Sequence, residues 1–122
     1  MADEVEQNQG TIKFSPGGAL VLSVPIGLQQ YDVAGDEWTH HTQEIGTSEE
    51  ALLLGDLATG GLVWVHNKDA TNYIEIRPGT GVADMIKVLA GEWQGPFRFA
   101  SAAPFAIADT AACEVEFVML EV

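Results

Sequence analysis

Turn-forming residues recur along this chain about every 8 to 12 residues, so the segments between the turns are short. The stretches SPGG, GDE, TGG, NKDATN, RPGTG and AGEWQGP each contain the Gly, Pro, Asn or Asp residues that turns require. Between them, apolar and polar residues alternate: in TNYIEIR, Ile74 and Ile76 share one face and Glu75 points to the other. This two-residue period predicts β-strands.

The fold class follows from the number of such strands. No window of about a dozen residues carries a helical stripe of apolar residues, and the one contender, TSEEALLLGDLATG, is interpreted as a strand or a single helical turn. Many short antiparallel strands bury their apolar faces by forming a sandwich or a barrel. We expect an all-β fold, an antiparallel β-sandwich that is jelly-roll-like, with little or no helix. The expected strands are residues 12–14, 19–24, 28–33, 38–45, 51–54, 62–66, 73–77, 85–89, 97–99, 105–108 and 113–122.

The domain organisation follows from length and from the start of the sequence. A chain of 122 residues suits one domain, because domains commonly contain roughly 100–150 residues. The first ten residues, MADEVEQNQG, are acidic and lack hydrophobic periodicity. We therefore expect a flexible acidic N-terminal arm at residues 1–10 and a single β-sandwich domain at residues 11–122.

The closing segment, CEVEFVMLEV, alternates at first and then becomes apolar on both faces. A strand that is apolar on both faces lies either at the centre of a sandwich or beneath a neighbouring subunit, and the sequence leaves both open. The residues that a neighbouring subunit would cover are Val118, Leu120 and Val122.

The charge balance narrows the classes of partner. With 18 acidic and 5 basic residues the net charge is −13, and the basic residues are scattered along the chain. Such a chain repels phosphate backbones and anionic lipid surfaces, so we expect no direct nucleic-acid binding and no membrane binding. The acidic start does not resemble a signal peptide, which indicates synthesis in the cytoplasm.

The stretch EWTHHTQE is the strongest candidate for a metal site, because histidines and carboxylates are metal ligands. On a regular strand His40 and His41 point to opposite faces, whereas His40, Thr42 and Glu44 share one. The cupin family of jelly rolls places ligand histidines two residues apart, so the resemblance to a metal cupin fails at this first pair. His66 would have to come from another strand.

Other catalytic signals are weak. Cys113 begins an alternating strand with glutamates beside it, which would raise the pKa of a thiol and make it a poor nucleophile, and no G-x-S-x-G elbow is present. We expect no enzymatic activity, no catalytic residue, no cofactor and no bound metal. Exposed tryptophans on β-sandwiches can bind sugars, so Trp38 and Trp93, which lie near turns, are candidate ligand-contact aromatics.

The second half of the chain resembles a known class of proteins. The segments NKDATNYIEI, MIKVLAGEW, PFRF and DTAACEVEFVMLEV, within residues 62–122, are similar to the small all-β structural proteins of tailed bacteriophages. The resemblance lies in turns and strands and assigns no functional residue. It implies a virion component that is jelly-roll-like and often trimeric, and that decorates or cements a capsid or belongs to the tail.

These observations lead to one expected function and two alternatives. We expect a bacteriophage virion structural protein, a capsid decoration or cement protein that stabilises the assembled shell as a homotrimer. Its partners would be copies of itself and the major capsid protein or another virion protein, and it would be made in the host cytoplasm and located in the virion. The first alternative is a receptor- or carbohydrate-binding module of a virion or tail. The second is a divergent metal cupin-like enzyme.

Overall fold

The computed structural model describes residues 5–33, 37–55, 57, 60–77, 86–99 and 104–121. The chain forms two compact units, Met1–Ala34 and Gly35–Val122. This division differs from the expected boundary between residues 10 and 11, because residues 5–31 build a structure of their own. Strand β1 (Val5–Asn8) lies within the stretch that was expected to be a flexible arm, and it is hydrogen-bonded to β4 (Leu28–Tyr31).

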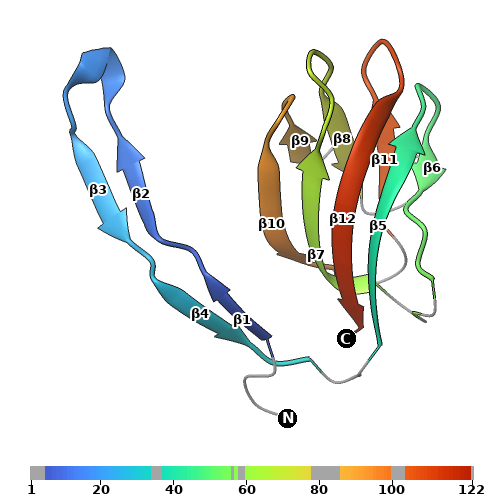
Figure 1. Ribbon diagram of the computed structural model, residues 1–122, viewed down its shortest axis with the longest axis horizontal. Coiled ribbons are helices and arrows are strands. Elements are labelled where there is room, and N and C mark those ends of the chain that lie inside the picture. Colours follow the sequence, from blue (N-terminus) through green and yellow to red (C-terminus); the bar gives the residue numbers. More distant parts are fainter. Residues whose placement is uncertain are drawn as a thin grey trace. The chain divides into compact units, whose positions relative to one another are not determined.

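The first unit contains a two-stranded antiparallel ribbon, which we call the hairpin arm (residues 5–31; Figure 1). Strand β1 pairs with β4, and β2 (Thr11–Phe14) pairs with β3 (Leu22–Pro25). Backbone hydrogen bonds from Gln9 to Gly27 (2.8 Å) and from Ile26 to Gly10 (2.8 Å) join the two halves. A short 3-10 turn, η1 (Pro16–Gly18), lies at the far end, where glycine allows the positive φ of 65° at Gly17.

The distal half of the hairpin arm has one apolar and one polar face. The register pairs Ile12 with Val24 and Phe14 with Leu22, and residues directly opposite in an antiparallel pair share a face. All four of these side chains are between 43% and 56% exposed. We call this surface the apolar arm face. Its reverse side carries Thr11, Lys13, Ser23 and Pro25.

The second unit is a sandwich of two four-stranded antiparallel sheets (Figure 1). One sheet has the order β10-β7-β12-β5 and the other has the order β6-β11-β8-β9. The strands are β5 (Trp38–Ile45), β6 (Glu50–Ala51), β7 (Gly60–Asn67), β8 (Ile74–Arg77), β9 (Ile86–Val88), β10 (Trp93–Arg98), β11 (Phe105–Ala108) and β12 (Cys113–Glu121).

Strand pairing in the sandwich is nested. The first strand, β5, pairs with the last, β12; β6 pairs with β11, β7 with β10, and β8 with β9. Folding this long nested hairpin over itself adds the pairs β12–β7 and β11–β8, which complete the two sheets. The result is the jelly-roll order, so the expected fold class is confirmed.

The core lies between the two sheets and follows the alternation seen in the sequence. Cys113, Val115, Phe117 and Met119 of β12 are all 0% exposed, and Ile74 and Ile76 of β8 face them from the other sheet. Within its own sheet β12 is flanked by β7 and β5, so it occupies a central position. The stretch TSEEALLLGDLATG was interpreted as a strand or a single helical turn. Among its described residues, Glu50 and Ala51 form the two-residue strand β6, consistent with the strand interpretation.

Candidate functional site

The side of the sheet β10-β7-β12-β5 that turns away from the core holds most of the residues that the sequence singled out. We call it the outer sheet face. Alternation along β12 sends Glu116, Val118 and Leu120 to this side, and strand register then places residues of β5, β7 and β10 beside them. These neighbours are Trp38, His40, Thr42, Glu44, Trp64, His66 and Trp93.

The register arranges the outer sheet face in rows across the strands. One row contains Trp93, His66, Glu116 and Thr42, which are successive partners on four strands. The next row toward the far end of β12 aligns Trp64, Val118 and His40, and the following row aligns Leu120 with Trp38. The face therefore changes from polar and aromatic to mainly apolar along β12.

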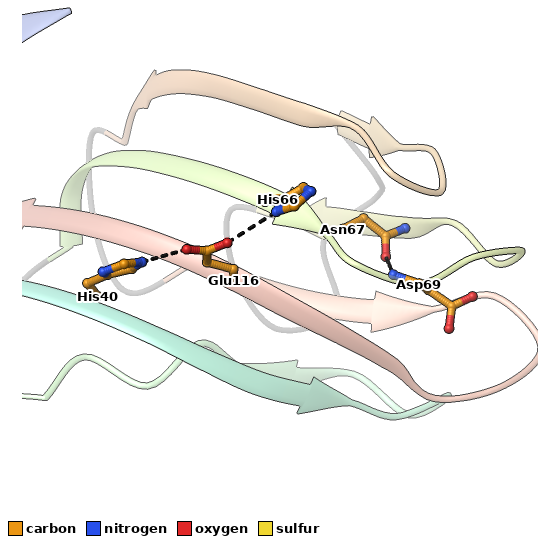
Figure 2. Close-up of polar contacts among 5 residues, drawn as sticks. All are labelled: His40, His66, Asn67, Asp69 and Glu116. Carbon is orange, nitrogen blue, oxygen red and sulfur yellow. Dashed lines mark hydrogen bonds and ion pairs between the residues drawn. The ribbon is translucent and has the colours of Figure 1, made fainter.

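A carboxylate bound by two imidazoles lies at the centre of the polar part (Figure 2). Nε2 of His40 lies 2.7 Å from Oε2 of Glu116, and Nδ1 of His66 lies 3.1 Å from Oε1 of the same side chain. The hydrogen bond with His40, followed by that with His66, lowers the pKa of Glu116 below its ordinary value. Glu116 therefore stays ionised and fixes the orientation of both rings.

Trp93 extends this cluster into an aromatic platform. Its ring stacks on His66 with centroids 4.5 Å apart and an interplanar angle of 9°. The side chain is 54% exposed, so the ring face that does not contact His66 is accessible. Stacked, partly exposed rings of this kind are suited to contacts with apolar side chains or with the faces of sugars.

The histidine–glutamate cluster does not have the geometry of a metal site. Two histidines and one carboxylate are a familiar ligand set, but here the carboxylate lies between the rings and offers a different oxygen to each (Figure 2). One ion could not contact both ring nitrogens without displacing Glu116. Among the residues that the structure describes, no group of three or more His, Cys, Asp or Glu could hold a metal ion.

The two adjacent histidines lie on opposite sides of β5, as alternation predicts. His40 bonds to Glu116 on the outer sheet face, while His41 meets the core residue Phe117 edge-on at 5.9 Å. An open pocket of about 470 Å³ adjoins this end of β5 and is lined by Glu37, Trp38, Thr39, His40, His41 and Gly55.

A second polar cluster organises the turn after β7. The buried amide of Asn67 donates to the carbonyls of Asn72 (2.8 Å) and Val88 (3.2 Å) and accepts from the backbone N–H of Asp69 (3.0 Å; Figure 2). The carboxylate of Asp69 in turn accepts the backbone N–H groups of Asn72 (2.7 Å) and Thr71 (3.0 Å), which lower the pKa of Asp69. This network fixes the turn, and Asn67 at its centre is 0% exposed.

The site residues expected from the sequence lie at several places in the structure. Val118 and Leu120 are half-buried on the outer sheet face, and Val122 lies outside the described residues. Trp38 and Trp93 are 66% and 54% exposed. Whether a subunit or a ligand covers these residues stays a prediction.

Sequence reasoning missed the central residue of the cluster, Glu116. It alternates with apolar residues in the same way as Glu114, so it looked like one more solvated acid. Only the register, which places Thr42 and His66 opposite it on the two neighbouring strands, distinguishes Glu116 from the other acids. His66 was considered as a distant ligand, and its approach to His40 is a property of the pairing.

The single thiol does not add a reactive group. Cys113 is 0% exposed, and burial, followed by the charges of Asp69 and Asp109, raises the pKa of its thiol. It is a small core residue in the first position of β12.

Comparison with protein families, with curated proteins and with solved structures gave no match. Within the described residues, no helix is long and apolar enough to cross a membrane.

Proposed function

We propose that this protein is a structural component of a bacteriophage virion, a capsid decoration or cement protein that acts without catalysis as a homo-oligomer. The single observation that carries the proposal is the hairpin arm. Its strands β2 and β3 are exposed at every residue. Their apolar side chains nevertheless lie on one face, as they do in a sheet that buries one of its faces. A two-stranded ribbon is marginally stable alone in water, so this surface suits a protein that works by association.

The sandwich supports the same class of function. Its outer sheet face presents Trp38 and Trp93 as exposed aromatics next to the half-buried Val118 and Leu120. Jelly-roll sandwiches serve in viral capsids, lectins and cupins, so the fold leaves several functions open. The resemblance of residues 62–122 to phage structural proteins favours the first of these.

The physical mechanism would be linkage between binding and assembly. A protein that binds only the assembled shell stabilises it in proportion to the logarithm of its free concentration over the dissociation constant. Symmetric oligomers can bridge equivalent subunits around a symmetry axis of the shell. The net charge of −13 would keep free subunits soluble and guide them toward basic patches on a partner.

The proposal is tested on particles from the source that encodes the chain. Mass spectrometry of purified particles should detect the protein in a fixed ratio to the major capsid protein. Particles stripped of it should lose heat or osmotic resistance and regain it when the purified protein is added back. Absence of the protein from washed particles would contradict the proposal.

A second candidate function, carbohydrate binding, is favoured by one specific observation. Trp38, 66% exposed, lines the open pocket together with Glu37, His40 and His41. An exposed indole beside hydrogen-bonding groups is the usual composition of a sugar subsite.

This candidate is tested with a glycan array followed by calorimetry on any sugar that binds. Trp38→Ala should abolish such binding while Trp93→Ala, which lies outside the pocket lining, should preserve it. An array without binding, or equal affinities for the two variants, would count against it.

A further inference from the structure

We infer that the apolar arm face of one copy packs on the outer sheet face of a second copy, so that the oligomer is held together by exchanged hairpin arms. The inference rests on the proposed homo-oligomer and names both surfaces that would form it.

The amphipathic character of the arm indicates that one side is made to be covered. Ile12 and Phe14 on β2 face the same way as Leu22 and Val24 on β3, and Thr11, Lys13 and Ser23 face the other way. Leu20 and Val21, near the turn, are also exposed, at 56% and 64%. Antiparallel sheets with one apolar face bury that face against another layer.

The distribution of charge indicates which surface of a second copy is available. Residues 7–31 contain a single charged residue, Lys13, and no carboxylate. Residues 35–122 contain 14 acidic and 4 basic residues, a net charge of −10. Contact between two sandwiches would bring like charges together, whereas contact between an arm and a sandwich does not.

The outer sheet face offers the matching surface. Its apolar rows combine Trp38, Trp64, Val118 and Leu120 on three adjacent strands. Strand β12 has nine residues, about 30 Å at 3.3 Å per residue, which accommodates the four-residue strands β2 and β3 and the turn between them. An arm lying there would form a third layer over the sandwich.

The first experiment compares two neighbouring residues on opposite faces of β3. Val24→Asp places a carboxylate on the apolar arm face, and Ser23→Asp places the same charge on the reverse face. By light scattering over a concentration series, wild type should be oligomeric. Val24→Asp should raise its dissociation constant at least about tenfold, because a buried unpaired carboxylate is strongly unfavourable. Ser23→Asp should stay within about twofold. Circular dichroism checks that both variants keep the sheet.

The second experiment locates the contact by cross-linking between copies. A copy with Leu22→Cys on the arm is mixed with a longer, tagged copy carrying Thr42→Cys on the outer sheet face, and a bismaleimide is added. The native thiol, Cys113, is buried and does not interfere. The expected product joins one short and one tagged copy. Lys87→Cys, an exposed position on the other sheet, serves as the control partner and should give little product.

Three results would overturn the inference. These are a monomer at every concentration, equal effects of Val24→Asp and Ser23→Asp, and products that join arm to arm without any that join arm to sheet. All are measured on the purified protein alone. A failed proposal of virion function, by contrast, would be seen only with particles, so the two failures can be told apart.

Discussion

At the scale of single residues, Glu116 decides how the outer sheet face is organised. It stands between the rings of His40 and His66 and accepts a hydrogen bond from each when they are protonated at the facing nitrogen. Since the pKa of Glu116 is lower in the folded protein than in the unfolded chain, its contribution to stability is present above the unfolded pKa and is lost as pH falls through the folded pKa.

We predict that His40→Ala raises the pKa of Glu116 more than His66→Ala does, because the hydrogen bond to His40 is the largest cause of the lowered value. Carboxyl carbon NMR titration of the two variants and wild type measures this directly. Glu114, an exposed residue on the same strand, provides the internal reference. Equal shifts in the two variants would contradict the prediction.

The side chain of Asn67 fixes the turn after β7 through its hydrogen bonds to three backbone groups. Asn67→Ala should lower the free energy of unfolding by about 2–3 kcal/mol, because it leaves buried backbone groups without their partners. Thr71→Ala, at an exposed position with a long 3.4 Å side-chain contact, is the matched control and should change stability by less than about 0.5 kcal/mol. Urea denaturation followed by tryptophan fluorescence compares them.

At the scale of strands and turns, β10 approaches β7 unusually closely. A Cβ atom on Gly95 would lie 2.8 Å from both Cα of Trp64 and the carbonyl oxygen of Val63. The register of the two strands also shifts between Gln94 and Phe97, so Gly95 lies within a bulge. The glycine thus permits the close approach of β10 to the backbone of β7 at Val63 and Trp64.

We predict that Gly95→Ala lowers the free energy of unfolding by roughly 1–3 kcal/mol more than Gly91→Ala. Both glycines have positive φ, 134° and 80°, but a Cβ at Gly91 meets nothing within 4 Å. The difference between the variants therefore contains the steric clash at Gly95 together with any additional backbone strain of an alanine at φ 134°. Equal midpoints in a thermal or urea titration would show that β10 can move away from β7 without loss.

The strands themselves were largely predictable from the sequence, because alternation and turn chemistry are local. Residues 38–45 and 105–108 were predicted with the bounds that the structure shows. The strand at Val5–Asn8 was missed, because VEQN has no apolar period. This segment forms a strand through its pairing with β4. Which strands pair, and in what register, was not predictable. TIKF and LSVP therefore resembled strands of the sandwich, although they pair with each other in a separate ribbon. The cluster at Glu116 was hidden for the same reason.

At the scale of the whole molecule, charge and apolar surface are separated along the chain. Fourteen of the 18 acidic residues belong to residues 35–122, and the longest stretch without one is residues 7–31. Association of copies must overcome repulsion between acidic sandwiches, and salt screens that repulsion.

We therefore predict that self-association becomes tighter as ionic strength rises from about 0.01 M to about 1 M, over which the Debye length falls from about 30 Å to about 3 Å. Analytical ultracentrifugation at several salt concentrations measures the effect, with Val24→Asp as the control that should remain more dissociated than wild type at each of them. Weaker association at high salt would indicate that attraction between charges, and not apolar contact, joins the copies.

The nested strand pairing has a consequence for the order of events during synthesis. The chain emerges from the ribosome with the hairpin arm first, while β12, which supplies Glu116, Val118 and Leu120, follows the seven other strands of the sandwich. The pair β5–β12 joins the most distant parts of the unit, so it closes the longest loop and forms late. A nascent chain thus exposes its apolar arm well before it can offer a docking surface, and copies made on the same message cannot interlock until each sandwich has closed.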